Sequence, residues 1–128
     1  MDATDRKIVL VTRKTRLQDM VVRYNTVEQA KFQAEHLGLD FSDFLAEDRT
    51  YAQALASVAE VLERHGRLQR LDRGFLPNFL FPPSCLVVVL GQDGLVANTL
   101  KYLDGQPLLA INPDPARWDG VLLPFTAD

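Results

Sequence analysis

Two hydrophobic patterns alternate along this chain, and each predicts one kind of secondary structure. Short, continuous apolar runs are typical of strands buried on both faces of a sheet, whereas apolar residues three and four positions apart indicate helices. The continuous runs are Lys7–Thr12, Cys85–Leu90 and Leu108–Ile111. The helical spacings lie at Thr26–Leu37, Tyr51–His65 and Leu95–Leu103. The chain is therefore expected to alternate between strands and helices.

Polar residues and glycines mark where the predicted elements begin and end. Capping-box spacings at Thr26–Gln29 and Thr50–Gln53 predict two helix starts. The segments between the elements have weaker patterns. We expect an irregular connector at Leu39–Asp48, a short second strand at Leu68–Leu71, a loop or short irregular helix at Gly74–Ser84, and an edge strand at Val121–Leu123.

This alternation predicts an α/β fold. Strands that alternate with helices form a mostly parallel sheet with helices on both faces. At 128 residues and 47% apolar composition, the chain is long enough for one such domain. We therefore expect a single three-layer, doubly wound, Rossmann-like domain over residues 1–128.

Charge and cysteine content narrow the function. A net charge of −3 argues against binding to nucleic acid or to an anionic membrane, and the N-terminal apolar run is too short for a signal or a membrane helix. The single cysteine, Cys85, excludes an internal disulfide and zinc-ligand spacing, and we interpret it as a small buried hydrophobe. The basic residues Arg13, Lys14 and Arg16 follow the first strand at its ligand-facing end, where they could meet phosphates, but a solvated charge run is the favoured interpretation. A cytoplasmic location and no metal site of the chain's own follow as expectations.

The candidate chemistry lies in the turn Gly91-Gln92-Asp93-Gly94, which joins a predicted strand to a predicted helix. Glycine lets the backbone adopt unusual angles and approach a ligand closely, and helix N-termini favour phosphate. Asp93 would accept a hydroxyl proton, bind magnesium or fix a ribose hydroxyl. The same four residues also fit an ordinary strand-to-helix connection in which Asp93 caps the helix.

A wider set of residues resembles the NAD kinase family. That family carries Gly-Gly-Asp-Gly-Thr after a hydrophobic strand, then a helix, then a strand that ends in a tripeptide such as Gly-Val-Asn. Here the turn is followed by a helical segment and by Ala110-Ile111-Asn112. The residues from Asn112 to Gly120 (NPDPARWDG) are similar to one branch's Asn-Thr-Asp-Pro-x-Arg-Ser-x-Gly, and Ile8–Thr15 is similar to that branch's first strand. The resemblance is specific from about Leu86 to Gly120.

The resemblance implies the N-terminal domain of an ATP-dependent phosphotransferase that converts NAD to NADP. Asp93 would be the catalytic residue that activates or positions the ribose hydroxyl. Gly91, Gln92 and Gly94 would shape the turn and Asn112 would line the nucleotide pocket, with Asp114 and Arg117 at its rim. ATP and Mg²⁺ are the implied cofactors and NAD the implied substrate. The family's β-rich C-terminal domain is not part of this sequence, and a homo-oligomer is a further implication.

Two residues depart from the family motif. Gln92 replaces its second glycine and Leu95 its threonine. With the second domain lacking, we expect this chain alone to be inactive. Two alternatives therefore stay open: a catalytically degenerate nucleotide-binding or interaction module, and a related lipid or sugar kinase domain. The ending at Asp128 leads us to expect the excised N-terminal half of a longer two-domain kinase rather than a naturally short protein.

Overall fold

The structure is a computed structural model that describes residues 6–117 and 125–126. Its contacts divide the chain into two compact units. The sheet unit comprises the chain up to Arg13 and from Ala54 onward, and the helical unit comprises Lys14–Gln53. Within the described ranges, no helix is both long enough and apolar enough to cross a membrane.

In the described part of the chain, the sheet unit is built on five parallel strands. They are β1 (Lys7–Thr12), β2 (Arg67–Asp72), β3 (Leu86–Leu90), β4 (Leu108–Asn112) and the two-residue β5 (Phe125–Thr126). Their order across the sheet is β2-β1-β3-β4-β5, and every pairing is parallel. The predicted parallel sheet is confirmed, and the weak second-strand signal at Leu68–Leu71 is confirmed within β2. The edge strand expected at Val121–Leu123 falls outside the described residues.

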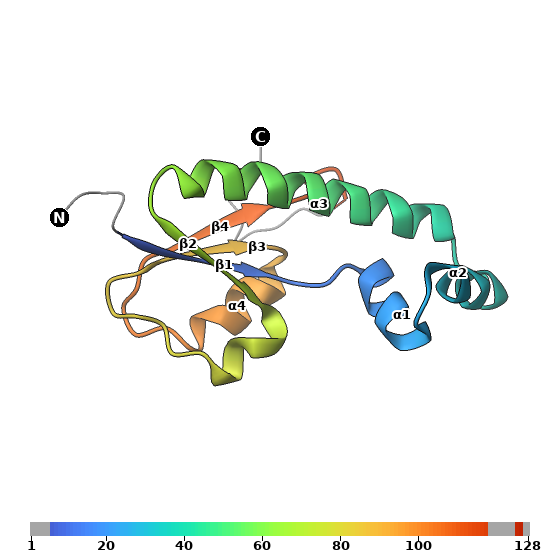
Figure 1. Ribbon diagram of the computed structural model, residues 1–128, viewed down its shortest axis with the longest axis horizontal. Coiled ribbons are helices and arrows are strands. Elements are labelled where there is room, and N and C mark those ends of the chain that lie inside the picture. The colour runs from blue at the N-terminus through green and yellow to red at the C-terminus, as the bar shows by residue number, and fades with distance from the viewer. Residues whose placement is uncertain (1–5, 118–124, 127–128) are drawn as a thin grey trace. The chain divides into compact units, whose positions relative to one another are not determined.

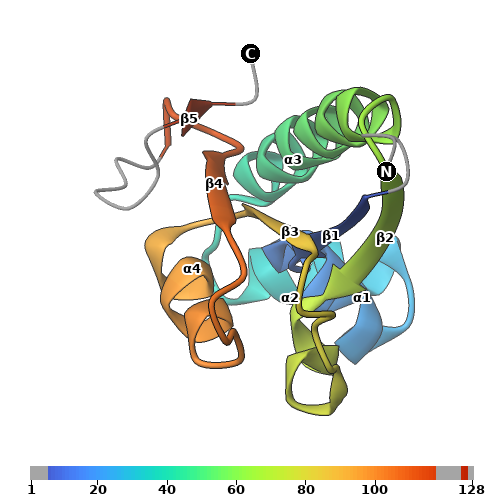
Figure 2. The ribbon, with the colours of Figure 1, turned by 90° about the vertical axis from the view of Figure 1, so that its left-hand side faces the viewer.

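Helices cover both faces of this sheet (Figures 1 and 2). The part of α3 (Phe41–Glu63) that belongs to the sheet unit lies on one face, and α4 (Asp93–Leu100) and the 3₁₀ helix η2 (Arg73–Asn78) lie on the other. The layout is that of a Rossmann-like α/β domain, as the sequence predicts. Pro77 lies inside η2, which agrees with the short irregular helix expected in Gly74–Ser84.

The central strands β1 and β3 are buried on both faces because their side chains alternate between two apolar layers. Val9, Val11, Val87 and Val89 all join one cluster, which includes Leu76 of η2 and Val96 of α4. The alternate residues Ile8, Leu10, Val88 and Leu90 are at most 1% exposed and face the other side. Continuous apolar runs in the sequence follow directly from this arrangement.

A close approach of two backbone segments explains the glycine after α3. A Cβ atom at Gly66 would collide with the backbone carbonyl oxygen of Arg6, and it would also lie 2.9 Å from a methyl group of Ile8. The Arg67 N–H donates to the same carbonyl over 2.8 Å. Gly66 therefore lets β2 start directly against β1. From the sequence alone, this glycine indicates only the end of a helix.

The sequence patterns miss one helix of the helical unit and misplace the start of another. Helix α1 (Arg16–Tyr24) begins within the basic run, where Thr15 caps it in a capping box with Gln18, and Lys14 and Arg16 are exposed. Arg16 pairs with Glu47 at 2.8 Å and stacks on the Phe44 ring at 4.4 Å. The remaining helix is α2 (Val27–His36), which starts at the predicted Thr26 cap.

The expected connector at Leu39–Asp48 is wrong as well, because α3 begins at Phe41 and continues unbroken to Glu63. Asp40 accepts hydrogen bonds from the Ser42 N–H at 3.1 Å and from the Ser42 hydroxyl at 2.6 Å, which caps this start. The capping box predicted at Thr50 and Gln53 therefore lies inside a helix. Phe41 and Phe44 are buried with Leu17, Ala30 and Ala34 in the core of the unit.

Candidate functional site

The Gly91–Gly94 turn lies at the carboxyl edge of the sheet. Strand β3 ends at Leu90 and α4 begins at Asp93, so only Gly91 and Gln92 connect them. Asp93 is thus the first residue of the helix, where the backbone dipole favours a negative charge. The backbone of Gln92 has the extended conformation of an N-cap, and its side chain makes no capping hydrogen bond. Predicted to begin at Leu95, the helix in fact begins two residues earlier and ends at Leu100 rather than Leu103.

The two glycines of the turn serve different purposes, and neither needs an unusual backbone angle. Among the described glycines, only Gly38 and Gly105 have positive φ, so the expectation of such angles at Gly91 and Gly94 is wrong. A Cβ at Gly91 would lie 2.7 Å from the Leu95 side chain. Glycine is therefore favoured here because it leaves room for Leu95 to pack. Gly94 has nothing within 4 Å of its Cβ position and is exposed. A ligand can therefore approach the first turn of α4 at Gly94.

Asn112 lies beside this turn, as the order of the strands dictates. It is the last residue of β4, and the Gly91 N–H donates to the carbonyl oxygen of the preceding Ile111 over 3.2 Å. Its side chain is only 4% exposed. The Asn112 Oδ1 atom accepts the Asp114 N–H at 3.0 Å, which fixes the amide and the chain that follows β4. The structure thus brings the ends of two neighbouring strands together at the predicted site.

Asp114 and Arg117 are joined by two hydrogen bonds. The Arg117 Nε atom donates to Asp114 Oδ2 at 3.2 Å, and its backbone N–H donates to the Asp114 carbonyl at 3.1 Å. Asp114 is 8% exposed, while Arg117 is half-buried. In this arrangement Asp114 orders the segment after β4, and Arg117 is the more accessible of the two. Residues 118–120, the end of the resembling segment, lie outside the described residues.

Leu95, one of the two departures from the family motif, is a core residue. It is 5% exposed and belongs to the apolar cluster between the sheet and α4. Its carbonyl accepts the buried Thr99 hydroxyl at 2.8 Å. A threonine at position 95 would direct its side chain into the same apolar layer. The side chain at this position therefore packs the helix against the sheet.

The strand order points to Arg13 as a further site candidate, although the sequence alone favours solvated charge there. From β1 the chain passes to β2 on one side and later to β3 on the other, and ligands in open α/β sheets bind where the order reverses in this way. The register pairs Val11 with Val89, which brings Arg13 and Gly91 level at the ends of β1 and β3. Arg13 is half-buried rather than solvated. A basic residue directly after the first strand is the signal that points to it.

The oxygen atoms at this edge fit a magnesium ion only in company with a nucleotide. No three His, Cys, Asp or Glu side chains gather as metal ligands anywhere in residues 6–117. Asn112 and Asp114 are engaged in the hydrogen bonds described above, and Asp93 is the carboxylate of the turn itself. Magnesium is commonly held by one or two carboxylates together with substrate phosphates and water. The donor set is compatible with that mode and not with an all-protein cage.

Comparison with known proteins does not place the chain in a family. The sequence matches no protein-family model, and no curated protein matches it significantly.

Proposed function

We propose that the chain is the nucleotide-binding N-terminal half of an NAD kinase-like phosphotransferase, in which ATP would phosphorylate NAD to NADP. The proposal rests on one observation above the others: Asp93 is the first residue of α4, and the buried Asn112 ends the neighbouring strand. Similarity of the Leu86–Gly120 segment to the NAD kinase family supplies the choice of nucleotide.

Each residue of the site would have a distinct role in this chemistry. The Asp93 carboxylate would accept a hydrogen bond from a ribose hydroxyl and take its proton as the phosphoryl group arrives. The Gly94 N–H, in the first turn of α4, would donate to a phosphate oxygen, because these amides have no partner within the helix. Asn112 would line the pocket, and Arg13 and Arg117 would supply positive charge at its edges.

Magnesium would accompany ATP and reduce the charge repulsion between its phosphates and Asp93. Asp93 would provide the chain's own oxygen ligand or remain hydrogen-bonded to the ribose hydroxyl. Phosphoryl transfer depends mainly on positioning and charge neutralisation, so a half-site binds without reacting. In the proposal, this chain alone binds nucleotide, and transfer requires a β-rich C-terminal domain.

A second candidate is a nucleotide-binding module that no longer supports transfer. Gln92 favours it, since this half-buried side chain stands where the family motif has glycine and a phosphate would lie close. Leu95 does not discriminate, because its side chain lies in the core. A related lipid or sugar kinase domain would share Asp93. Its acceptor is not a dinucleotide, so the Asn112–Arg117 segment would not form a dinucleotide site.

Calorimetric titration of the chain with NAD, NADP and Mg-ATP tests the proposal, with Asp93→Ala as the site variant. Asp104→Ala is a matched control, because Asp104 is an exposed carboxylate beyond the other end of α4. We expect Asp93→Ala to weaken binding at least tenfold and Asp104→Ala to leave it unchanged. Equal affinity in both variants, or no saturable binding of any nucleotide to the wild type, would overturn the proposal.

A further inference from the structure

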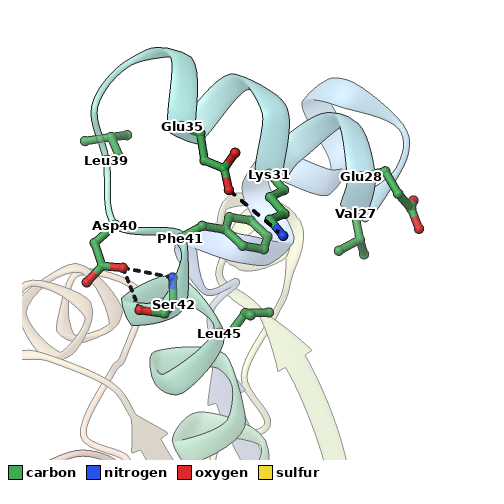
Figure 3. A pocket seen from close by; sticks show the side chains of 9 residues that line it. All are labelled: Val27, Glu28, Lys31, Glu35, Leu39, Asp40, Phe41, Ser42 and Leu45. Atoms are coloured by element: carbon green, nitrogen blue, oxygen red, sulfur yellow. Dashed lines mark hydrogen bonds and ion pairs between the residues drawn. The ribbon is translucent and has the colours of Figure 1, made fainter.

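The helical unit has a hollow of its own, formed between α2 and the start of α3 (Figure 3). Its volume is about 650 Å³. We call it the α2–α3 hollow; its lining residues are Val27, Glu28, Lys31, Glu35, Leu39, Asp40, Phe41, Ser42 and Leu45. All of these lie within the helical unit, and none belongs to the proposed nucleotide site.

The apolar part of the lining combines one buried ring with three exposed side chains. Phe41 is 7% exposed and forms part of the unit's core. Around it, Val27, Leu39 and Leu45 are 46%, 45% and 39% exposed. Exposed apolar side chains that cluster beside a hollow and are rimmed by charge are typical of interaction sites.

The charged part of the lining is predominantly acidic. Three carboxylates face one lysine, which gives the lining a formal charge of −2. Lys31 lies 4.0 Å from Glu35, in an exposed pair one helical turn apart. Figure 3 shows Glu28 and Asp40 on opposite sides of Phe41. Asp40 uses Oδ1 to accept hydrogen bonds from Ser42. Glu28 has no ion pair among the described residues.

A neighbouring hollow shows that the negative charge is local. Leu39 also borders a second, smaller hollow of about 330 Å³. That one is lined by Arg16, Arg23 and a single carboxylate, Asp19, with Met20 and Phe44 among its apolar residues. The acidic character is therefore specific to the α2–α3 hollow, while the apolar surface continues past Leu39.

We propose that the α2–α3 hollow binds a basic, amphipathic segment of a partner protein. Apolar side chains of that segment would pack against Val27, Leu39 and Leu45. Its lysine or arginine side chains would reach Glu28 on one side and Asp40 on the other. The complementary charges select a basic partner over an acidic one and speed its association. An amphipathic helix in an apolar groove is a common mode of peptide recognition.

The lining favours a peptide over a small enclosed ligand. Sites for small molecules bury most of the ligand surface. Here Lys31 and Glu35 are 60% and 59% exposed, and the three apolar rim residues are each more than one third exposed. Such an open surface covers one face of a segment and leaves the other face in water. Continuity of the apolar surface past Leu39 suits an extended occupant.

Fluorescence anisotropy with designed peptides tests the proposal on the full chain. The probe is a labelled peptide of leucine and lysine, with leucines at helical spacing over about four helical turns. The same peptide with glutamate in place of lysine tests the sign of the charge. The hollow variant is Glu28→Gln with Leu45→Ala. The matched control is Glu63→Gln with Val61→Ala, which removes an exposed carboxylate and a 49% exposed apolar residue from another part of α3.

We expect the hollow variant to weaken binding of the lysine peptide at least tenfold and the control to change it less than twofold. The glutamate peptide should bind at least tenfold more weakly than the lysine peptide. In the wild type, the amide signals of residues 27–45 should shift most on titration, which does not depend on any variant folding. Equal losses in the hollow variant and its control would overturn the proposal, as would absent binding, equal binding of both peptides, or a self-associated chain that already covers Leu39 and Leu45.

Discussion

Replacing Leu95 with threonine separates two interpretations of the motif around Asp93. In the NAD kinase family a threonine follows the second glycine of the turn, which makes position 95 a candidate ligand contact. In the structure, Leu95 is 5% exposed and packs in the apolar cluster of the sheet unit. Leu95→Thr should therefore reduce stability and leave nucleotide binding unchanged.

The magnitude follows from what the substitution removes. Truncation of a buried leucine to alanine costs about 2 to 5 kcal/mol. Threonine restores some volume but buries a hydroxyl. Thr99 donates its own hydroxyl to the Leu95 carbonyl at 2.8 Å, four residues earlier, but the residue four before position 95 is Gly91, which lies outside the helix. A net loss of about 2 to 4 kcal/mol results, or roughly 8 to 16 °C in Tm at about 4 °C per kcal/mol.

Leu100→Thr is the control, because Leu100 ends the same helix and is 50% exposed. Its cost should stay below about 1 kcal/mol, mostly from helix propensity. Urea unfolding followed by circular dichroism measures both variants, and calorimetry measures their nucleotide binding. A Leu95→Thr cost no greater than that of Leu100→Thr, or tighter nucleotide binding in Leu95→Thr, would contradict this prediction.

Three further predictions concern the framework of the two units. Gly66→Ala should lower the free energy of unfolding by more than about 1 kcal/mol, because its Cβ meets a backbone carbonyl, while Gly94→Ala should be neutral or stabilising in a thermal melt. Thr15→Ala should cost about 1 to 2 kcal/mol in urea unfolding, and more than Thr26→Ala, because Thr15 is a buried cap and Thr26 an exposed one. Burial raises the pKa of the Cys85 thiol, so alkylation of the folded chain should be slow. The folded state then keeps the Cys85 thiol proton to a higher pH than the unfolded state does. The free energy of unfolding should therefore fall as the pH rises past the ordinary thiol pKa, and Cys85→Ala should abolish this fall.

The sheet could be predicted from sequence because its strands are buried on both faces. Burial of both faces produces the uninterrupted apolar runs of β1, β3 and β4. Strand β2 gave a weaker signal since it lies at the edge of the sheet, where only Leu71 is fully buried. Its partner β1 supplies the pairing that the Arg67–Asp72 sequence does not itself indicate.

The helical unit was harder to predict because its helix starts were ambiguous. Thr50 and Gln53 have capping-box spacing, yet they lie inside α3, where both residues are tolerated. The true start is at Phe41, and the Asp40 cap was present in the sequence as an aspartate ahead of Phe41 and Phe44 at helical spacing. The Thr15–Gln18 capping box of α1 lies within the basic run, which is interpreted from sequence as solvated charge and not as a helix start.

The candidate site was predictable as a place but less so in its details. A carboxylate after a buried strand locates Asp93 at the carboxyl edge of the sheet, and the strand order brings Asn112 beside it. The orientation of Leu95 toward the core and the mutual hydrogen bond of Asp114 and Arg117 depend on packing that no local pattern encodes.

The most direct test of the central claim is a nuclear magnetic resonance titration of the wild-type chain with NAD. If nucleotide binds at the carboxyl edge of the sheet, the largest saturable shifts will occur at the amides of residues 91–96 and of Asn112, and they will vanish in Asp93→Ala. Saturable shifts confined to other residues, or none up to about 10 mM NAD, where even a complex of −3 kcal/mol would be populated, would contradict the claim.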